Sequence, residues 1–234
     1  MTAEAVKGPF PCFYGWQKVS LLDFPARVAT TLFTFGCNLR CPYCHNPELV
    51  APELKPPAIP WPRIHAFLAK RSTLLDGVCI TGGEPLLQSW LPDVVEQIKA
   101  LGLAVKVDTN GLLPDRLIEL PVDFIAMDIK APFSRYRALG AGKDAVERLR
   151  RSLDYIKASG IAHELRTTVA PGIIGREDVP WLCDALQGCG QYVLTGFHPG
   201  KTLSEDFTPE PYTRTYLESM RDTLRAAGIP CSIR

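Results

Sequence analysis

Six short apolar runs alternate with helix-like segments along this chain of 234 residues, and this alternation limits the fold more than any other feature of the sequence. Most of the runs are apolar on both faces, as expected of strands in a parallel sheet that helices cover. The predicted strands are residues 28–35, 77–81, 103–109, 123–129, 162–168 and 191–197. The predicted helices are residues 62–74, 89–101, 114–120, 143–159, 177–187 and 212–227.

Strands that alternate with helices predict an α/β fold with a parallel sheet. Six strands are fewer than the eight that close a full barrel, so we expect a partial (β/α)6 TIM-like barrel that is open on one side. A doubly wound open sheet is the second choice. We expect one domain over residues 1–234, divided into an N-terminal edge segment at 1–26 with a strand or hairpin at 17–22, a barrel core at 27–200, and a C-terminal helix and tail at 201–234.

Charge and hydropathy exclude several classes of protein. Lys and Arg number 26 against 25 Asp and Glu, a formal net charge of +1, so the chain has no electrostatic reason to bind nucleic acid or an acidic membrane surface. No apolar run reaches the roughly 18 residues of a membrane-spanning helix, and residues 1–11 lack the apolar core of a signal peptide. We therefore expect a cytoplasmic protein with no nucleic-acid or membrane partner, whose thiols stay reduced.

Cys37, Cys41 and Cys44 form a C-x3-C-x2-C motif within FGCNLRCPYCHNP, directly after the first predicted strand. Four kinds of site fit this pattern. Cys41 and Cys44 alone match a redox dithiol, and the same pair with His45 matches covalent haem attachment. The three thiolates with His45 supply the ligands of a zinc site. The fourth kind is an iron–sulfur cluster that only three cysteines hold.

Spacing and context favour the iron–sulfur cluster. The dithiol leaves Cys37 unused, haem attachment of this kind belongs to exported proteins, and the four zinc ligands lack the second half of an ordinary two-part zinc module. The cluster uses all three thiols, in a loop at the carboxyl end of a strand, where parallel α/β folds build their sites. A cubane has four irons, so three thiolates leave one iron open to an amine and carboxylate chelate.

The motif and its surroundings resemble a known family. C-x3-C-x2-C with an aromatic residue before the last cysteine is similar to the signature of the radical S-adenosylmethionine (radical SAM) superfamily. The longer stretch LLDFPARVATTLFTFGCNLRCPYCHNPELV resembles the activating enzymes of glycyl radical enzymes, above all those of anaerobic ribonucleoside-triphosphate reductase and next those of pyruvate formate-lyase. The resemblance continues as spaced motifs to about His198. It implies a [4Fe-4S] cluster on the three cysteines, with S-adenosylmethionine bound to the open iron.

Polar residues also occur at the ends of the other five predicted strands. In chain order they are Gly82, Gly83 and Glu84; Asp108 and Thr109; Asp128 and Lys130; Arg166 and Thr168; and His198. Taken singly, each has a simpler explanation as a turn, an Asx turn, a structural ion pair or a surface histidine. Because the carboxyl ends of parallel strands meet at one edge, we expect these residues to line one site.

The resemblance implies how most of these residues contact the cofactor. The loop with Glu84 holds the amino group of S-adenosylmethionine, and the Glu84 carboxylate is offered to that ammonium. Lys130 and His198 reach the cofactor carboxylate. Tyr43 and His45 lie near the adenine.

Four further polar residues lie at the ends of the third, fourth and fifth predicted strands. Arg166 and Thr168 alternate to one face of their strand, which we expect to face the interior. By resemblance, Asp128 meets polar groups of the cofactor, and Asp108 with Asp128 helps to hold a monovalent cation.

The resemblance implies a single radical SAM domain that acts as an activase. It reductively cleaves S-adenosylmethionine and uses the 5′-deoxyadenosyl radical to take hydrogen from a glycine of a partner, anaerobic ribonucleotide reductase, with flavodoxin or ferredoxin as electron donor. One alternative is a minimal radical SAM enzyme for a small molecule, similar to 7-carboxy-7-deazaguanine synthase. That family usually carries Trp and Asp where this chain has Tyr43 and His45. A zinc-binding or thiol-redox module is a remote alternative. An auxiliary cluster is a further, less favoured reading of Cys12, Cys79, Cys183, Cys189 and Cys231.

Overall fold

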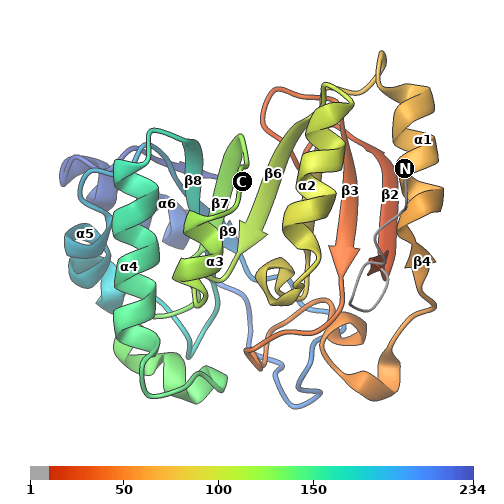
Figure 1. The fold of residues 1–234 in the computed structure, drawn as a ribbon. Coiled ribbons are helices and arrows are strands. Elements are labelled where there is room, and N and C mark those ends of the chain that lie inside the picture. Colours follow the sequence, from red (N-terminus) through yellow and green to blue (C-terminus); the bar gives the residue numbers. More distant parts are fainter. Residues whose placement is uncertain (1–10) are drawn as a thin grey trace.

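A single eight-stranded sheet organises residues 11–234, which are the residues that the computed structural model describes (Figure 1). The first ten residues of the predicted edge segment therefore lie outside the described residues. The strand order is β10-β9-β8-β7-β6-β5-β3-β2, and all neighbours are parallel except β2 and β3. The strands are β2 (Gly15–Ser20), β3 (Ala29–Thr34), β5 (Gly77–Gly82), β6 (Ala104–Thr109), β7 (Phe124–Asp128), β8 (Ala162–Val169), β9 (Tyr192–Gly196) and β10 (Cys231–Ile233).

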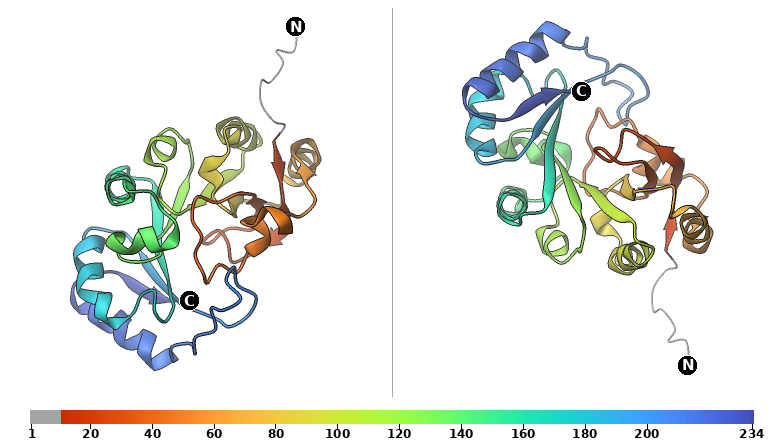
Figure 2. Two further views of the ribbon diagram at one scale, coloured as in Figure 1. Left: turned by 90° about the horizontal axis from the view of Figure 1, so that it is seen from below. Right: turned by 90° about the horizontal axis from the view of Figure 1, so that it is seen from above.

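The α-helices of residues 11–234 lie outside the curved sheet, as the views along the strands show (Figure 2). Proline occupies the first turn, where the missing N–H costs nothing, in four of the described helices, at Pro62, Pro92, Pro114 and Pro180. The helices are α1 (Trp61–Arg71), α2 (Leu91–Ala100), α3 (Pro114–Ile118), α4 (Ala145–Ala158), α5 (Val179–Leu186) and α6 (Arg214–Ala226). Shorter elements are the strand pair β1 (Cys12–Phe13) and β4 (Ile59–Pro60), and the 3-10 turns η1 (Pro47–Leu49), η2 (Pro52–Leu54), η3 (Pro85–Leu87), η4 (Phe133–Leu139) and η5 (Arg176–Asp178).

The partial barrel predicted from the sequence is confirmed. Each predicted strand and helix is present, and β2 occupies the expected sheet edge. The strands from β3 to β9 follow one another in chain order across the sheet, without the reversal of order that a doubly wound sheet requires. The sequence did not predict β10 or the β1–β4 pair, because elements of two or three residues are too short to show a periodic pattern.

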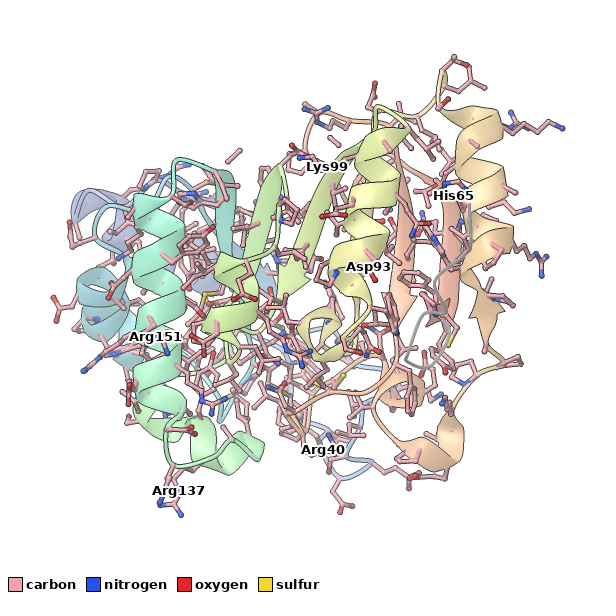
Figure 3. All side chains as sticks on the ribbon, viewed as in Figure 1. Arg40, His65, Asp93, Lys99, Arg137 and Arg151 are labelled. Atoms are coloured by element: carbon pink, nitrogen blue, oxygen red, sulfur yellow. The ribbon has the colours of Figure 1, made fainter. Side chains whose placement is uncertain are left out.

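The outer face of the sheet carries the apolar core. Val94, Val95 and Ile98 of α2 are fully buried, as are Leu149 and Ile156 of α4, which matches the one-sided apolar stripe of a helix packed on a sheet. Charged side chains on the opposite sides of these helices reach solvent (Figure 3). None of the helices within residues 11–234 is long and apolar enough to cross a membrane.

Candidate active site

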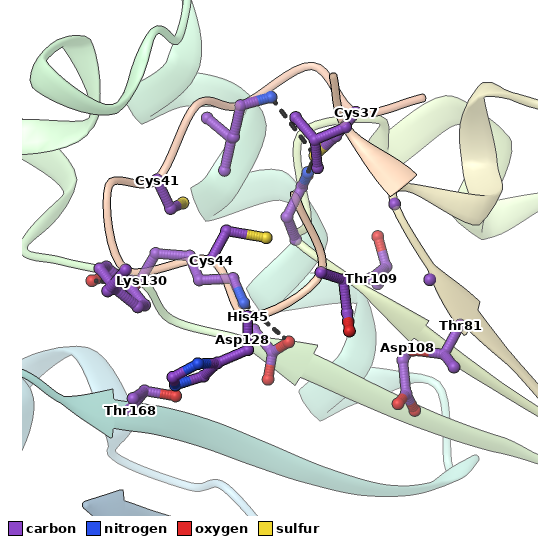
Figure 4. Close-up of a pocket in the computed structure, with 17 residues that line it drawn as sticks. Cys37, Cys41, Cys44, His45, Thr81, Asp108, Thr109, Asp128, Lys130 and Thr168 are labelled. Carbon is purple, nitrogen blue, oxygen red and sulfur yellow. Dashed lines mark hydrogen bonds and ion pairs between the residues drawn. The ribbon is translucent and has the colours of Figure 1, made fainter. Parts of the chain in front are cut away.

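A cavity of about 220 Å³ opens at the carboxyl ends of β5 to β8, beneath the loop that follows β3 (Figure 4). Side chains from four strands and this loop converge on it, as the sequential parallel order of the sheet requires. The lining includes twelve residues predicted from the sequence: Cys37, Cys41, Tyr43, Cys44, His45, Gly82, Gly83, Asp108, Thr109, Asp128, Lys130 and Thr168. Glu84, Arg166 and His198 do not line it.

The three cysteines of the motif surround one shared space (Figure 4). Burial raises the pKa of the Cys37 thiol, and it raises that of Cys41 to about 11 even though the Lys130 ammonium opposes the shift. A metal must therefore displace a proton from these thiols when it binds. Within residues 11–234, no three Cys, His, Asp or Glu side chains converge closely enough to hold a single metal ion. Three thiols arranged around one space suit a cluster of several irons, in which each thiolate would bind a different iron.

The cysteine loop is joined to segments from distant parts of the chain. The Arg40 N–H donates to the Leu139 carbonyl at 2.7 Å, beyond β7. After β9, the Leu203 N–H donates to the Cys44 carbonyl at 3.0 Å, and the Ser204 N–H donates to the Pro42 carbonyl at 3.1 Å. The loop therefore spans the mouth of the barrel and is held from both sides.

Two glycines allow the loop after β5 to approach the cysteine loop. Gly82 has φ +115°, and a Cβ there would lie 2.5 Å from the Thr34 nitrogen. A Cβ on Gly83 would lie 2.1 Å from the Gly36 carbonyl oxygen. Only glycine fits both positions, so the backbone itself forms this wall of the cavity.

Glu84 was expected to meet an ammonium of the cofactor, and in this structure its side chain does not line the cavity. Its carboxylate is 1% exposed. Oε1 accepts hydrogen bonds from the Leu86 N–H at 3.1 Å and the Thr109 hydroxyl at 2.9 Å, and Oε2 accepts from the Asn110 N–H at 2.8 Å. Burial raises the pKa of Glu84 to about 7 against the opposing effect of these bonds. Glu84 therefore ties the loop after β5 to the loop after β6.

Charged side chains on the inner face of the sheet form one connected network. Arg166 Nε lies 2.8 Å from Asp128 Oδ1, and Arg166 Nη1 lies 3.2 Å from Asp108 Oδ2. Lys130 Nζ donates to Asp128 Oδ2 at 3.0 Å, and Lys106 Nζ donates to Asp108 Oδ1. Burial alone would raise the pKa of Asp128, but Arg166 and Lys130 hold that pKa below its usual range. Arg166 does not line the cavity itself, but it pairs with the Asp108 and Asp128 carboxylates, which do.

Lys106 is the member of this network that sequence reasoning missed. Its side chain is 1% exposed, and it lies in the middle of the apolar strand β6. The missed signal was the spacing, because residues two apart on a strand face the same side, which places Lys106 beside Asp108.

The monovalent cation predicted at Asp108 and Asp128 does not fit this donor set. Each of the four carboxylate oxygens already has a Lys or Arg nitrogen as partner. An added cation would have to displace one of the protein's own cationic groups.

The aromatic residues of the cysteine loop border the cavity as expected. The Tyr43 hydroxyl donates to the Lys130 carbonyl at 3.1 Å, which fixes the loop to the end of β7. The His45 ring stacks on Phe197, with ring centroids 5.6 Å apart and planes at 14°. His198 is exposed and does not line the cavity. Asn110, for which no role was predicted, also lines the cavity.

Comparisons with known proteins agree with this geometry. The profile of the Radical SAM superfamily matches residues 31–181. A Methanocaldococcus jannaschii protein named as a glycyl-radical enzyme activating enzyme is 28% identical over 206 residues, covering 84% of each chain. The pyruvate formate-lyase-activating enzyme of Clostridium pasteurianum is 29% identical over 202 residues, covering 80% of this chain and 81% of its own. The 7-carboxy-7-deazaguanine synthase of Methanopyrus kandleri is 34% identical over 118 residues, covering 42% of this chain and 47% of its own.

The fold has counterparts among solved structures. Streptococcus suis SuiB bound to S-adenosylmethionine superimposes with a TM-score of 0.66 at 15% identity, covering 86% of this chain and 48% of that one. The superfamily match extends over more than half of the chain and includes the cysteine loop and β3 to β8. It implies a [4Fe-4S] cluster and S-adenosylmethionine as cofactors. The chain is therefore an enzyme that belongs to the radical SAM superfamily.

Proposed function

We propose that this enzyme activates a glycyl radical enzyme by removing a hydrogen atom from a glycine of that partner protein. The observation that carries the proposal is the convergence of Cys37, Cys41 and Cys44 on a cavity at the carboxyl ends of parallel strands. Relatives named as activating enzymes support it, because they match 80% to 84% of the chain. The match to a 7-carboxy-7-deazaguanine synthase covers only 42%.

In the proposed site, the thiolates of Cys37, Cys41 and Cys44 would hold a [4Fe-4S] cluster, and S-adenosylmethionine would supply the ligand that the protein does not. When bound, the cluster supplies the electron that splits the cofactor into methionine and the 5′-deoxyadenosyl radical that takes the hydrogen. The contribution of the protein is to bind and orient the cofactor and to exclude competing reactions.

Each part of the cavity has a proposed role toward the cofactor. The bare backbone at Gly82 and Gly83 gives its amino end room to approach. Lys130 places a cation at the cavity for the cofactor carboxylate, and Asp128 holds that ammonium in position. Tyr43 and His45 border the adenine, and the stack on Phe197 fixes the plane of the His45 ring. Glu84 and His198 have no direct role in this proposal, since neither lines the cavity.

We propose that the protein supplies its own cation where a monovalent ion was expected. The Lys106 ammonium is buried against Asp108, and Arg166 bridges Asp108 and Asp128. Together with Lys130, these side chains give the two carboxylates three basic partners. Binding of S-adenosylmethionine should therefore not depend on added sodium or potassium.

We propose anaerobic ribonucleoside-triphosphate reductase as the partner, since the cysteine-loop sequence resembles that of its activators. The proposed electron donor is a flavodoxin or ferredoxin. None of the eight cysteines forms a disulfide in the structure, and this supports a reducing compartment such as the cytoplasm.

The test uses protein reconstituted with iron and sulfide without oxygen, together with a low-potential reductant, S-adenosylmethionine and purified anaerobic ribonucleotide reductase from the same organism. A glycyl doublet in the electron paramagnetic resonance (EPR) spectrum of the partner, formed with 5′-deoxyadenosine, is the expected result. Cys41→Ser should abolish both products. The matched control Cys183→Ser changes a half-buried thiol in α5, outside the cavity, and should retain both.

Two other outcomes separate the alternatives. Cofactor cleavage without a doublet on any glycyl radical enzyme of the organism would overturn the activase proposal. Turnover of a small heterocyclic substrate would then favour a synthase, an alternative that the identity of 34% over 118 residues supports.

A further inference from the structure

Asn110 follows β6 and lines the cavity, yet nothing in the proposed function uses it. The residue is 5% exposed. Its side-chain oxygen accepts a hydrogen bond from the Leu112 N–H at 3.0 Å. Its side-chain nitrogen donates to Asn38 Oδ1 at 2.7 Å and to Cys37 Sγ at 3.9 Å. Each polar atom of this side chain therefore has a partner inside the protein.

These partners determine which way the Asn110 amide faces. If its oxygen and nitrogen exchanged places, the amide N–H groups would face the Leu112 N–H, and the oxygen would face Asn38 Oδ1. A donor would then face a donor at Leu112, and an acceptor would face an acceptor at Asn38. The observed orientation leaves one amide hydrogen for Asn38 and the other for the sulfur of Cys37.

The backbone holds the Asn110 amide at this distance from Cys37. The Asn110 N–H donates to Glu84 Oε2 at 2.8 Å, and Glu84 also accepts from the neighbouring Thr109 hydroxyl. The loop after β6 is thus anchored to the loop after β5, which itself packs against the cysteine loop through Gly83. This anchoring positions the Asn110 amide beside the Cys37 sulfur.

Cys37 Sγ accepts hydrogen bonds from two sources. The Leu39 N–H lies 3.5 Å away and belongs to the cysteine loop itself, whereas the Asn110 amide comes from another strand end. Hydrogen bonds to cysteine sulfur stabilise the more negative, reduced form of an iron–sulfur cluster, so they raise its reduction potential. A substitution can remove the side-chain donor of Asn110, whereas the backbone N–H of Leu39 remains.

We propose that Asn110 is a positioning residue whose amide donates a hydrogen bond to the Cys37 sulfur and raises the reduction potential of the cluster that Cys37 helps to hold. The inference rests on the proposed cluster site. It adds a function for the turn after β6, which is to set how readily the enzyme accepts its electron.

The experiment measures the midpoint potential of the reconstituted holoprotein by redox titration followed by EPR. Asn110→Ser keeps a short side chain whose oxygen can bond the Leu112 N–H, but it cannot reach Cys37. Its midpoint should shift to a more negative value. Asn110→Asp keeps the shape but replaces the donor with an acceptor, and its shift should be larger. Asn38→Ser is the matched control, since it removes the other partner of the amide and leaves the sulfur bond, and it should leave the potential near that of the wild type.

An unchanged midpoint in Asn110→Ser, at normal cluster content, would overturn the role of Asn110 while leaving the proposed function intact. Wild-type protein that takes up no [4Fe-4S] cluster would overturn both. If the Asn110 variants fail to assemble a cluster, the hydrogen bond to Cys37 can be tested in the wild-type holoprotein. With asparagine side-chain amides labelled with ¹⁵N, the reduced cluster should show weak nitrogen hyperfine coupling that persists in Asn38→Ser. The absence of such coupling would refute the hydrogen bond.

Discussion

Glu84 and Thr109 join the ends of two neighbouring strands through a 2.9 Å hydrogen bond that is entirely buried. Together with the bonds from the Leu86 and Asn110 N–H groups, it makes the Glu84 carboxylate the point where the loops after β5 and β6 meet. All three partners are donors, so the site is built for two acceptor oxygens.

Glu84→Gln should destabilise the protein because the amide has one acceptor oxygen in place of two. Its NH₂ group would face at least one of the donor groups of Leu86, Thr109 and Asn110. Leaving a buried donor unsatisfied costs about 1–3 kcal/mol of unfolding free energy. Denaturant unfolding of the anaerobic apoprotein measures this. Glu53→Gln, at an exposed position, is the control and should have no effect. Equal stability of Glu84→Gln and wild type would contradict the loop-joining role.

The stability of the wild type should also fall relative to Glu84→Gln as the pH rises. The pKa of Glu84 is raised from an ordinary 4.5 to about 7, so the folded state binds this proton more tightly than the unfolded state does. The stabilisation is complete below about pH 4.5 and is lost as the pH rises to 7. The full shift corresponds to about 3 kcal/mol. Unfolding free energies of both proteins between pH 5 and pH 8 test the sign, and a difference that is constant across this range would refute it.

Lys106→Met should make the protein sensitive to monovalent cations. The substitution removes the buried ammonium and leaves an oxygen of Asp108 without its basic partner. Loss of a partner from a buried charged group costs about 1–3 kcal/mol or more. Sodium or potassium should recover part of this loss in the variant, while the wild type should melt at the same temperature in either salt and in tetramethylammonium chloride.

The control for the Lys106 experiment is Lys70→Met, at an exposed position of α1, which should behave as the wild type. A wild type whose melting temperature rises in potassium would show that Asp108 and Asp128 do accept an added ion.

Gly82→Ala should be far more damaging than Gly102→Ala. Both glycines have positive φ, +115° and +77°, so both variants carry backbone strain of about 1 kcal/mol. Only at Gly82 does the new Cβ also meet backbone, 2.5 Å from the Thr34 nitrogen, while the space around Gly102 is open. We expect Gly82→Ala to lose at least about 2 kcal/mol more, and to retain less iron after reconstitution. Similar stabilities of the two variants would mean that the close approach of the loops is not required.

The sequence predicted those parts of the site that depend on strand position. The ends of parallel strands meet at one edge, so Asp108 and Asp128 could be placed at the cavity from the chain order of the strands. The cysteine motif could be placed at the cavity for the same reason, since its loop follows the first parallel strand, β3. Boundaries of the helices were also predictable where proline or glycine marks a turn, as at Pro62 and Gly228.

The remaining features depend on tertiary contacts that a linear pattern does not contain. A carboxylate after two glycines suits a ligand as well as a loop, and only the donors from Thr109 and Asn110 decide the direction of Glu84. Lys106 interrupts an apolar strand, and its burial depends on Asp108 and Arg166 lying beside it. His198 follows its strand by two residues, and only the fold shows that its exposed side chain does not line the cavity.

The hydrogen bonds from Leu203 and Ser204 to the cysteine loop have a consequence for biosynthesis. On the ribosome the ligand thiols emerge long before these two residues do. The pocket that receives the iron is therefore finished only when most of the polypeptide has been made and its sheet has formed. Metal loading should follow folding, and a nascent chain released before Leu203 would carry every ligand cysteine yet lack the clamp that holds them in place.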